Sequence, residues 1–233
     1  MNIDQNLSHV KQLIAQAAMV SNRSTDSILL LAVSKKQSVE SITQAFNLGV
    51  TDFGENYYQE ALLKINALKD LPMSWHFIGP IQSNKTKGIA THFHWVHSVN
   101  RLIIARLLNE YRPPRLPPLN VCLQVNLVAE ETKSGILPEQ AKELALAVSQ
   151  LPNLKLRGLM TIPPPQKGQA KQYNLLIQLK QLMESINQET GLKMDTLSMG
   201  MSDDLTPAIK AGSTIVRVGR AIFGEREVIK NEY

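Results

Sequence analysis

The stretch Leu29-Leu30-Leu31-Ala32-Val33-Ser34-Lys35-Lys36-Gln37 is an apolar run of strand length that ends in a polar turn. The run does not alternate between apolar and polar residues, so it predicts a strand buried on both faces, as in a parallel sheet covered by helices. Lys35 directly follows the run. A lysine that points into a walled cavity is desolvated and can form an imine with an aldehyde. In the plainer interpretation, Lys35 and Lys36 are two solvated turn lysines.

Segments typical of strands and segments of helical periodicity alternate along the rest of the chain. Apolar residues recur at helical spacing over residues 3–20, which predicts an amphipathic helix ahead of the first strand. The predicted strands are 29–33, 51–53, 75–78, 94–97, 119–126, 155–160, 196–198 and 214–217. The predicted helices between them are 39–46, 57–68, 84–92, 101–111, 138–151, 169–188 and a segment that ends at Gly212.

Eight such alternations favour a closed (β/α)8 barrel, the TIM barrel, over an open doubly wound sheet in a chain of 233 residues. The G-x-G-x-x-G pattern of a dinucleotide fold is absent after the first strand. The chain has no Gly/Ser-rich linker and no shift in composition. We therefore expect residues 1–233 to form a single α/β barrel domain with an extra N-terminal helix.

The charge and the cysteine content restrict the function classes. The net charge is +5 and the isoelectric point is near 9.3, which is compatible with nucleic acid, with an acidic small molecule or with no specific ligand. The basic residues form no run of five and no nucleic-acid-binding motif, so we expect no nucleic-acid partner. No apolar window reaches the ~18 residues that span a bilayer, and residues 1–11 lack a signal-peptide apolar region. The single cysteine, Cys122, lies in an apolar run, which predicts a core residue in a cytoplasmic protein.

Polar residues follow the predicted strands, where barrels place their working groups. They are Lys35, Asn56, His76 with Gly79, Asn100, Arg101, Asn126, Thr161, the 198–202 segment and the 217–220 segment. This ring combines an amine, amides, an imidazole and guanidinium groups. Glu55 is the one well-placed carboxylate, which argues against hydrolysis by a pair of carboxylates.

The last two of these turns predict an anion site, because barrels often bind phosphate after strands seven and eight. Gly200 and Gly219 allow the backbone to approach an anion closely. Ser202 offers a hydroxyl and can cap a helix, and Arg220 adds a positive charge. In the plainer interpretation, these are two ordinary strand-to-helix turns.

Three residues of this region constrain the anion site. Asp203 and Asp204 repel an anion and so must point away from it. Pro207 removes an internal donor if the helix begins at Ser202, and it fits better if Thr206 is the cap.

An amine at one strand end and a phosphate site across the mouth suit a ligand with an aldehyde and a phosphate. Pyridoxal 5'-phosphate (PLP) is the leading candidate, with Arg217 facing its ring nitrogen. A class I aldolase acting on a sugar phosphate is an alternative use of the lysine. A metal site drawn from His92, His94 and His97 has no carboxylate ligand nearby, and two of these histidines flank a strand start. We therefore expect no metal.

With these residues identified, the sequence resembles the pyridoxal-phosphate homeostasis proteins, the YggS/PROSC family. The shared motifs run through essentially the whole chain: LAVSK (31–35), FGENY (53–57), WHFIGPIQSNK (75–85), KSG (133–135), LRGLM (156–160), SMGMSDD (198–204) and VRVGRAIFG (216–224). So many motifs in the same order are far more specific than one short pattern.

The resemblance implies a barrel like the N-terminal domain of alanine racemase, with PLP held as an imine on Lys35. It also implies that the phosphate is held by Ser202, Gly219 and Arg220, that Arg217 faces the ring nitrogen, and that Asn56 lies near the ring. His76 and Lys133 match family motifs near the mouth.

The sequence departs from many relatives after Lys35. These relatives have Ser-Lys-Thr-Lys-Pro, whereas this chain has Lys36-Gln37-Ser38 after Ser34-Lys35. The second lysine is displaced by one position, so a secondary cofactor role for it is open, as is competition by Lys36 for the aldehyde. Side chains alternate direction along a strand, so we do not expect both lysines to reach the cavity.

Racemisation requires acid/base groups on both faces of the bound amino acid. In the racemases that the sequence resembles, one of them is a tyrosine from a C-terminal β-domain of the partner subunit. We expect the eight strand–helix units to take up the chain except for residues 228–233, which are too few for such a domain. We therefore expect a PLP carrier or buffer in vitamin B6 homeostasis rather than an enzyme, with a PLP-dependent racemase-like enzyme as the alternative. We expect it to be a monomer, with apo-PLP enzymes as recipients.

Overall fold

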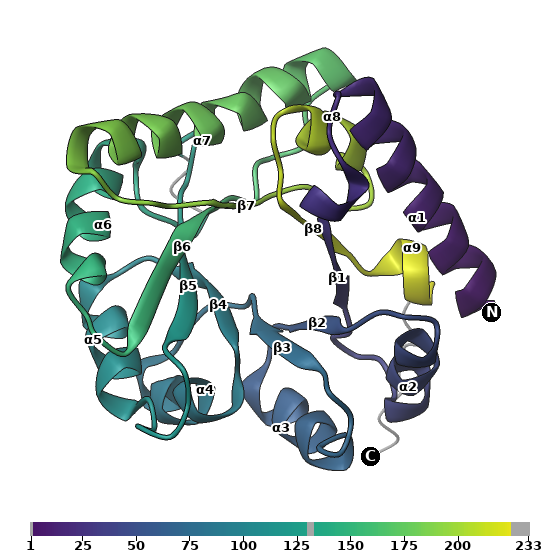
Figure 1. Cartoon of the computed structure of the whole chain (residues 1–233), viewed down its shortest axis with the longest axis horizontal. Coiled ribbons are helices and arrows are strands. Elements are labelled where there is room, and N and C mark those ends of the chain that lie inside the picture. The colour runs from purple at the N-terminus through teal and green to yellow at the C-terminus, as the bar shows by residue number, and fades with distance from the viewer. Residues whose placement is uncertain (1, 130–132, 225–233) are drawn as a thin grey trace.

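Eight parallel strands form a closed barrel in the computed structural model, which describes residues 2–129 and 133–224 (Figure 1). The strands are β1 (Leu29–Val33), β2 (Asp52–Glu55), β3 (Ser74–Phe77), β4 (Trp95–Val99), β5 (Leu119–Gln124), β6 (Leu154–Met160), β7 (Thr196–Ser198) and β8 (Ile215–Val218). Each strand pairs with the next, and β1 also pairs with β8 through Leu31 and Arg217. This last pairing closes the barrel and confirms the predicted fold class.

Helices surround the barrel (Figure 1). They are α1 (Ile3–Val20), α2 (Val39–Asn47), α3 (Tyr58–Ala67), α4 (Thr86–His92), α5 (Leu102–Tyr111), α6 (Ala141–Ser149), α7 (Gln169–Thr190), α8 (Leu205–Lys210) and α9 (Arg220–Phe223). The extra N-terminal helix α1 is present and contacts α8 and α9. The side chain of Asn2 caps it by accepting hydrogen bonds from the backbone N–H groups of Asp4 and Gln5. No helix in the described part of the chain is long and apolar enough to cross a membrane.

Most predicted elements are shifted by only a few residues, but two details are different. The helix after β7 begins at Leu205 with Asp204 at its N-cap position, so neither Ser202 nor Thr206 caps it. Pro207 then lies in the first turn, where its missing N–H is not needed. The short helix α9, which follows β8, was not among the predicted helices.

Residues alternate between the inside of the barrel and the layer under the helices. Ala32 and Phe53 belong to the large apolar cluster between sheet and helices. Leu31, Ile78 and Ile215 form a separate small cluster inside the barrel. This small apolar cluster leaves much of the barrel interior to polar side chains.

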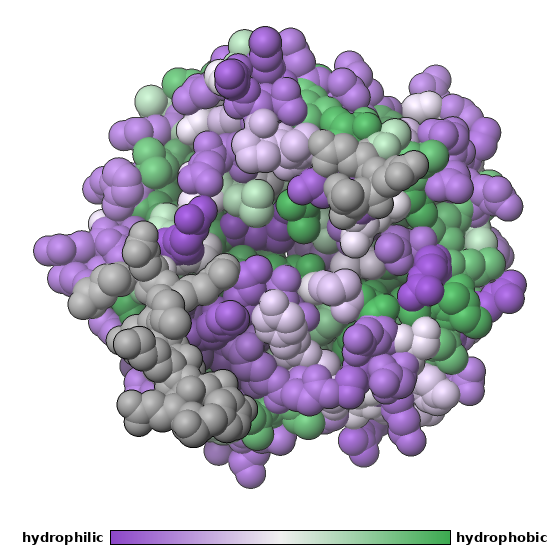
Figure 2. All heavy atoms as spheres, turned by 180° about the vertical axis from the view of Figure 1, so that it is seen from behind, coloured by the Kyte–Doolittle hydropathy of each residue, from purple (hydrophilic) through white to green (hydrophobic). Residues whose placement is uncertain are grey.

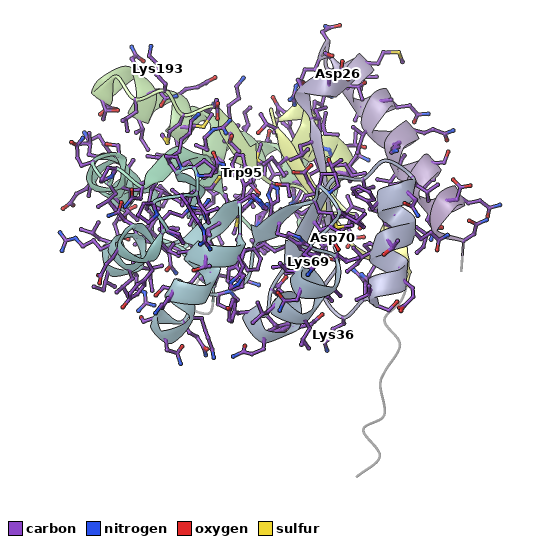
Figure 3. The ribbon with its side chains drawn as sticks, turned by 60° about the horizontal axis from the view of Figure 1, so that its bottom comes forward. Asp26, Lys36, Lys69, Asp70, Trp95 and Lys193 are labelled. Atoms are coloured by element: carbon purple, nitrogen blue, oxygen red, sulfur yellow. The ribbon has the colours of Figure 1, made fainter. Side chains whose placement is uncertain are left out.

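The carboxyl ends of the strands open on the side turned away from the viewer in Figure 1. Lys36 follows β1, whereas Asp26 and Lys193 precede β1 and β7, and Figure 3 places Lys36 at the opposite end of the molecule from these two. Figure 2, seen from behind, shows this side with a hollow at its centre. We call this hollow the mouth of the barrel.

Candidate binding site at the mouth of the barrel

Lys35 lies in the turn directly after β1 and is half-buried, whereas Lys36 is exposed. Lys36 has a positive φ of 61°, and its backbone N–H donates to Glu60 Oε1. The turn is also held at Ser34, whose hydroxyl donates to Glu55 Oε1 over 2.6 Å. Hydrogen bonds on both sides of Lys35 therefore fix the backbone that carries it.

A buried ion pair lies beneath this turn. Lys64 of α3 donates from Nζ to Glu55 Oε1 at 2.8 Å, to Glu60 Oε1 at 2.6 Å and to the Ser34 carbonyl at 2.7 Å. Glu55 is fully buried and points outward from β2 toward α3. Burial raises the pKa of the Glu55 carboxyl, and the Lys64 charge acts against this rise. Glu55, the carboxylate that the sequence placed at the mouth, therefore stabilises the turn after β1 instead of facing the mouth.

Asn56 follows β2 and is half-buried, with its carboxamide oxygen buried and without a hydrogen-bond partner among the described residues. The loop after β3 fixes its backbone, because a Cβ atom on Gly79 would lie 2.1 Å from the Asn56 carbonyl oxygen. A buried amide oxygen without a partner costs free energy unless a ligand supplies a donor.

The turn after β7 depends on Gly200. Its φ is +94°, and a Cβ atom there would lie 2.5 Å from the Cβ of Ala208. Asp204 turns away from the mouth, since its carboxylate accepts from the backbone N–H of Met201 at 2.6 Å and from Gln172 Nε2 at 2.8 Å. Ser202 is left half-buried on this turn.

The turn after β8 begins with Gly219, where a Cβ atom would lie 3.2 Å from the Val33 carbonyl oxygen. The predicted placement of the anion turn across the mouth from Lys35 is therefore wrong: barrel closure makes β1 and β8 neighbours. Arg220 is two-thirds exposed, and its Nη2 lies 3.5 Å from Asp203 Oδ2. This pair links the turns after β7 and β8.

Arg217 is a buried cation inside the barrel. Its Nη1 donates to Ser198 Oγ at 2.7 Å and its Nη2 donates to the Thr161 carbonyl at 2.8 Å. Burial lowers the pKa of Arg217 to about 10, and the Asp204 charge opposes this shift. The side chain of Cys122, predicted to be a core residue, is fully buried, and burial raises the pKa of its thiol to about 12.

The prediction that His76 is a cofactor-binding residue at the mouth needs correction. Its side chain is fully buried inside the barrel, with Nε2 2.9 Å from Asp52 Oδ1 and Nδ1 2.9 Å from His97 Nε2. The ring also stacks on Trp95, at 5.5 Å between centroids. His76 belongs to β3 itself and points into the barrel, so protein groups occupy both of its nitrogens. Lys133, the other family-motif residue, is exposed, and its carbonyl accepts a hydrogen bond from Asn126 Nδ2.

Sequence reasoning did not predict that Asp52 and His97 are hydrogen-bonded to His76 inside the barrel. Residues 52, 76, 97 and 217 all lie on predicted strands, where side chains alternate between the two faces of the sheet. This alternation could have indicated that they share a face, but only the register of the strands shows that the face is the inside of the barrel. The three histidines considered for a metal point to different partners, His92 to the Gly88 carbonyl, His94 to the Trp75 N–H and His97 into the barrel. Within residues 2–129 and 133–224, no cluster of three or more His, Cys, Asp or Glu residues could hold a metal ion.

The fold and the polar mouth define a parallel (β/α)8 barrel with a candidate ligand site at the carboxyl ends of the strands. A family model described as "Alanine racemase, N-terminal domain" matches residues 4–227. The "Pyridoxal phosphate homeostasis protein" of Pseudomonas aeruginosa is 54% identical, with 97% of this chain and 96% of that protein covered. The protein of the same name from Escherichia coli K12 is 46% identical, with 98% and 99% covered. The chain belongs to the alanine racemase N-terminal domain family and, within it, to the pyridoxal phosphate homeostasis proteins.

Solved structures agree with this assignment. PipY of Synechococcus elongatus PCC7942, solved with PLP bound, is 32% identical with a TM-score of 0.83, covering 96% of this chain and all of that one. Alanine racemase of Clostridium difficile 630 has a TM-score of 0.75 at 16% identity, with 96% of this chain but 56% of that one covered. The second likeness shows the shared barrel fold alone.

Proposed function

We propose that this protein binds PLP at the mouth of the barrel and holds and releases it as a carrier or buffer in PLP homeostasis. The names of its relatives and the PLP-bound PipY structure support this function. The observation that carries the proposal is the contact of Gly219 with Val33, which brings the anion turn beside the Lys35 turn. The aldehyde and the phosphate arm of PLP are attached to neighbouring ring carbons, so neighbouring sites suit them better than opposite ones.

The residues at the mouth fit the cofactor. Asn56 has a buried oxygen that needs a donor. Gly200 and Gly219 let the turns after β7 and β8 pack closely on Ala208 and Val33. Arg217 has five N–H donors, and its bonds to Ser198 and Thr161 occupy two of them. When bound, PLP supplies an aldehyde to which an amine can be attached with loss of water.

Each residue has an assigned role in this proposal. Lys35 supplies the amine, and Arg217 donates a hydrogen bond toward the ring nitrogen. Asn56 lies near the ring. Ser202, Gly219 and Arg220 hold the phosphate. His76 is removed from this set, because protein groups already occupy both of its ring nitrogens.

We also propose that the protein has no catalytic turnover of its own. Besides Lys35, two carboxyl groups near the mouth could move a substrate proton, and the protein holds both: Glu55 through Lys64 and Ser34, and Asp204 through Met201 and Gln172. The alternative is a PLP-dependent racemase-like enzyme. The test is an assay of the purified PLP-loaded protein for racemisation and transamination across amino acids. Substantial turnover of any of them would overturn the carrier proposal.

The binding proposal is tested by borohydride reduction of the PLP-loaded protein, followed by peptide mass spectrometry. We expect a pyridoxyl adduct on Lys35 that disappears in Lys35→Ala. Lys36→Ala is the matched control and should retain the adduct, since Lys36 is exposed. An adduct on Lys36, or the absence of any adduct in the unmodified chain, would contradict the assignment.

Three further proposals concern context. We propose that residues 1–233 act as one domain, that the protein is a cytoplasmic monomer, and that apo-PLP enzymes receive the cofactor. Size-exclusion chromatography with light scattering tests the monomer. Transfer is tested by mixing the PLP-loaded protein with an apo-enzyme and comparing the rate of reactivation with that given by an equal amount of free PLP.

A further inference from the structure

A continuous line of hydrogen bonds crosses the barrel interior from one end toward the other. His76 Nε2 lies 2.9 Å from Asp52 Oδ1, and His76 Nδ1 lies 2.9 Å from His97 Nε2. His97 Nδ1 lies 2.7 Å from Ser198 Oγ, which accepts from Arg217 Nη1 at 2.7 Å. His76, His97 and Ser198 are fully buried, and both ring nitrogens of His76 and of His97 have a hydrogen-bond partner. We call these five residues the interior chain.

The chemistry of its two ends gives the interior chain one direction. A guanidinium only donates, so Ser198 Oγ accepts from Arg217 and directs its own proton to His97 Nδ1. A neutral His97 then carries its proton on Nε2 and donates to His76 Nδ1. His76 in turn carries its proton on Nε2 and donates to the Asp52 carboxylate, which only accepts. Every bond therefore runs from the arginine to the aspartate.

The burial of the histidines supports their neutral state. Burial lowers the pKa of His97 well below its ordinary value, and the proximity of His76 and of the Arg217 charge lowers it further. Burial also lowers the pKa of His76, although Asp52 opposes this shift. Partial burial acts to raise the pKa of Asp52, but hydrogen bonds with His76 and Thr51 outweigh it and keep the carboxyl below its ordinary value. The carboxylate thus stays ionised next to a neutral imidazole.

We propose that His76 and His97 are positioning residues that hold the Arg217 guanidinium toward the PLP ring, anchored by Asp52 at the opposite end of the barrel. This inference rests on the proposed function for the role of Arg217. Bidentate fixation by Ser198 and the Thr161 carbonyl leaves the guanidinium one orientation. The Ser198 hydroxyl directs its proton to His97, so its lone pairs face the Arg217 guanidinium.

Asp52 makes the interior chain accessible to experiment. Its side chain is 15% exposed at the amino-terminal end of β2, away from the mouth. Asp195 is a matched control at the same end: it precedes β7, pairs with Arg157 at 2.9 Å and has no hydrogen bond to the interior chain among those observed. Substitution of either residue removes one negative charge from that end.

The first measurement is ¹⁵N NMR of the histidine ring nitrogens in the unmodified protein without PLP. We expect His76 and His97 to be neutral near pH 7, with the proton of each on Nε2. Assignment uses His76→Gln and His97→Gln, and the exposed His9 is the internal reference. A proton on Nδ1 of either ring, or an imidazolium, would contradict the proposed direction of the hydrogen bonds in the interior chain. This result does not depend on PLP binding.

The second measurement is PLP affinity and the absorption spectrum of bound PLP in Asp52→Ala, Asp52→Asn and Asp195→Ala. We expect roughly tenfold weaker binding and a shifted absorption maximum in Asp52→Ala, because His76 loses its ionised acceptor and keeps only the Ser74 hydroxyl, 3.2 Å from Nε2. Asp52→Asn should restore both, since its amide oxygen still accepts, and Asp195→Ala should match the unmodified protein. Unchanged affinity and spectrum in Asp52→Ala would overturn the proposal. Failure of every variant and of the unmodified protein to bind PLP would instead overturn the proposed function.

Discussion

Lys64 Nζ lies 2.8 Å from Glu55 Oε1, and this ion pair is buried beneath the turn that carries Lys35. Lys64 also binds the Ser34 carbonyl, so one ammonium joins α3, β2 and the turn after β1. Removing one partner of a buried pair leaves an uncompensated charge. The pair therefore couples the stability of the fold to the position of the proposed PLP lysine.

Lys64→Met should lower the free energy of unfolding by about 3 kcal/mol and weaken PLP attachment to Lys35. Without Lys64, the pKa of Glu55 rises further, because burial already raises it. The folded state then retains a proton that the unfolded state releases, so the variant loses stability as the pH rises above the ordinary carboxyl range. Urea denaturation at acidic and neutral pH measures both effects. Lys142→Met, which breaks a half-exposed pair with Glu189, is the control and should change little. Equal stability of the two variants would contradict the structural role of Lys64.

Asn56→Ala should separate binding from stability. The buried Asn56 oxygen has no partner among the described residues, so the substitution should change the free energy of unfolding by less than about 1 kcal/mol. PLP binding should weaken roughly fivefold, as measured by titration. Asn187→Ala is the opposite case, because this amide bonds both the N–H and the carbonyl of Met194. It should lose stability and keep its affinity. A large stability loss in Asn56→Ala would show that the protein itself uses this oxygen.

Gly200→Ala tests the turn after β7. Gly168 has a similar φ of +90° but no atom within 4 Å of a Cβ, so Gly168→Ala reports the backbone penalty alone, roughly 1–3 kcal/mol. Gly200→Ala adds the contact with Ala208 and should cost roughly 1–3 kcal/mol more. It should also weaken binding of inorganic phosphate, measured as competition with PLP. Two variants of equal stability would mean that the turn relaxes without strain.

Asp203→Asn should strengthen PLP binding, because it removes the carboxylate that competes with an anion for Arg220. Both side chains are largely exposed, so the ion pair itself adds little stability and the melting temperature should hardly change. The gain in affinity should shrink as salt is added. Asp26→Asn is the control, because Asp26 precedes β1 whereas Asp203 follows β7, so the same charge is removed at the other end of the barrel. Equal gains in both variants would indicate a general charge effect rather than a local one.

The sequence predicted the barrel well because its evidence is repeated eight times. Each apolar run followed by a segment of helical periodicity indicates one strand–helix unit. An error of a few residues at one boundary does not change the number of these units. The turn glycines were found for a related reason, since their backbone requirements are local. Gly200 was singled out for the close approach of an anion, and the structure shows that it also has a positive φ of +94°.

The arrangement of the site was less predictable. His76 was placed at the mouth because it stands near a strand end, but its ring lies inside the barrel between Asp52 and His97. Glu55 is one residue earlier than Asn56 and faces the opposite way, into the layer beneath α3. A difference of one position reverses the direction of a side chain on a strand, and boundary errors are of the same size.

The sequence by itself determined the closed α/β barrel, the family of the chain and the set of polar residues at the strand ends. These depend on periodicity and on local backbone requirements, which the order of residues expresses directly. Only the tertiary structure decided which residues meet: Gly219 with Val33, Lys64 with Glu55, and Asp52 with Arg217 through the interior chain. These contacts join segments far apart in the sequence, and they follow from the register and closure of the barrel, which no single segment encodes.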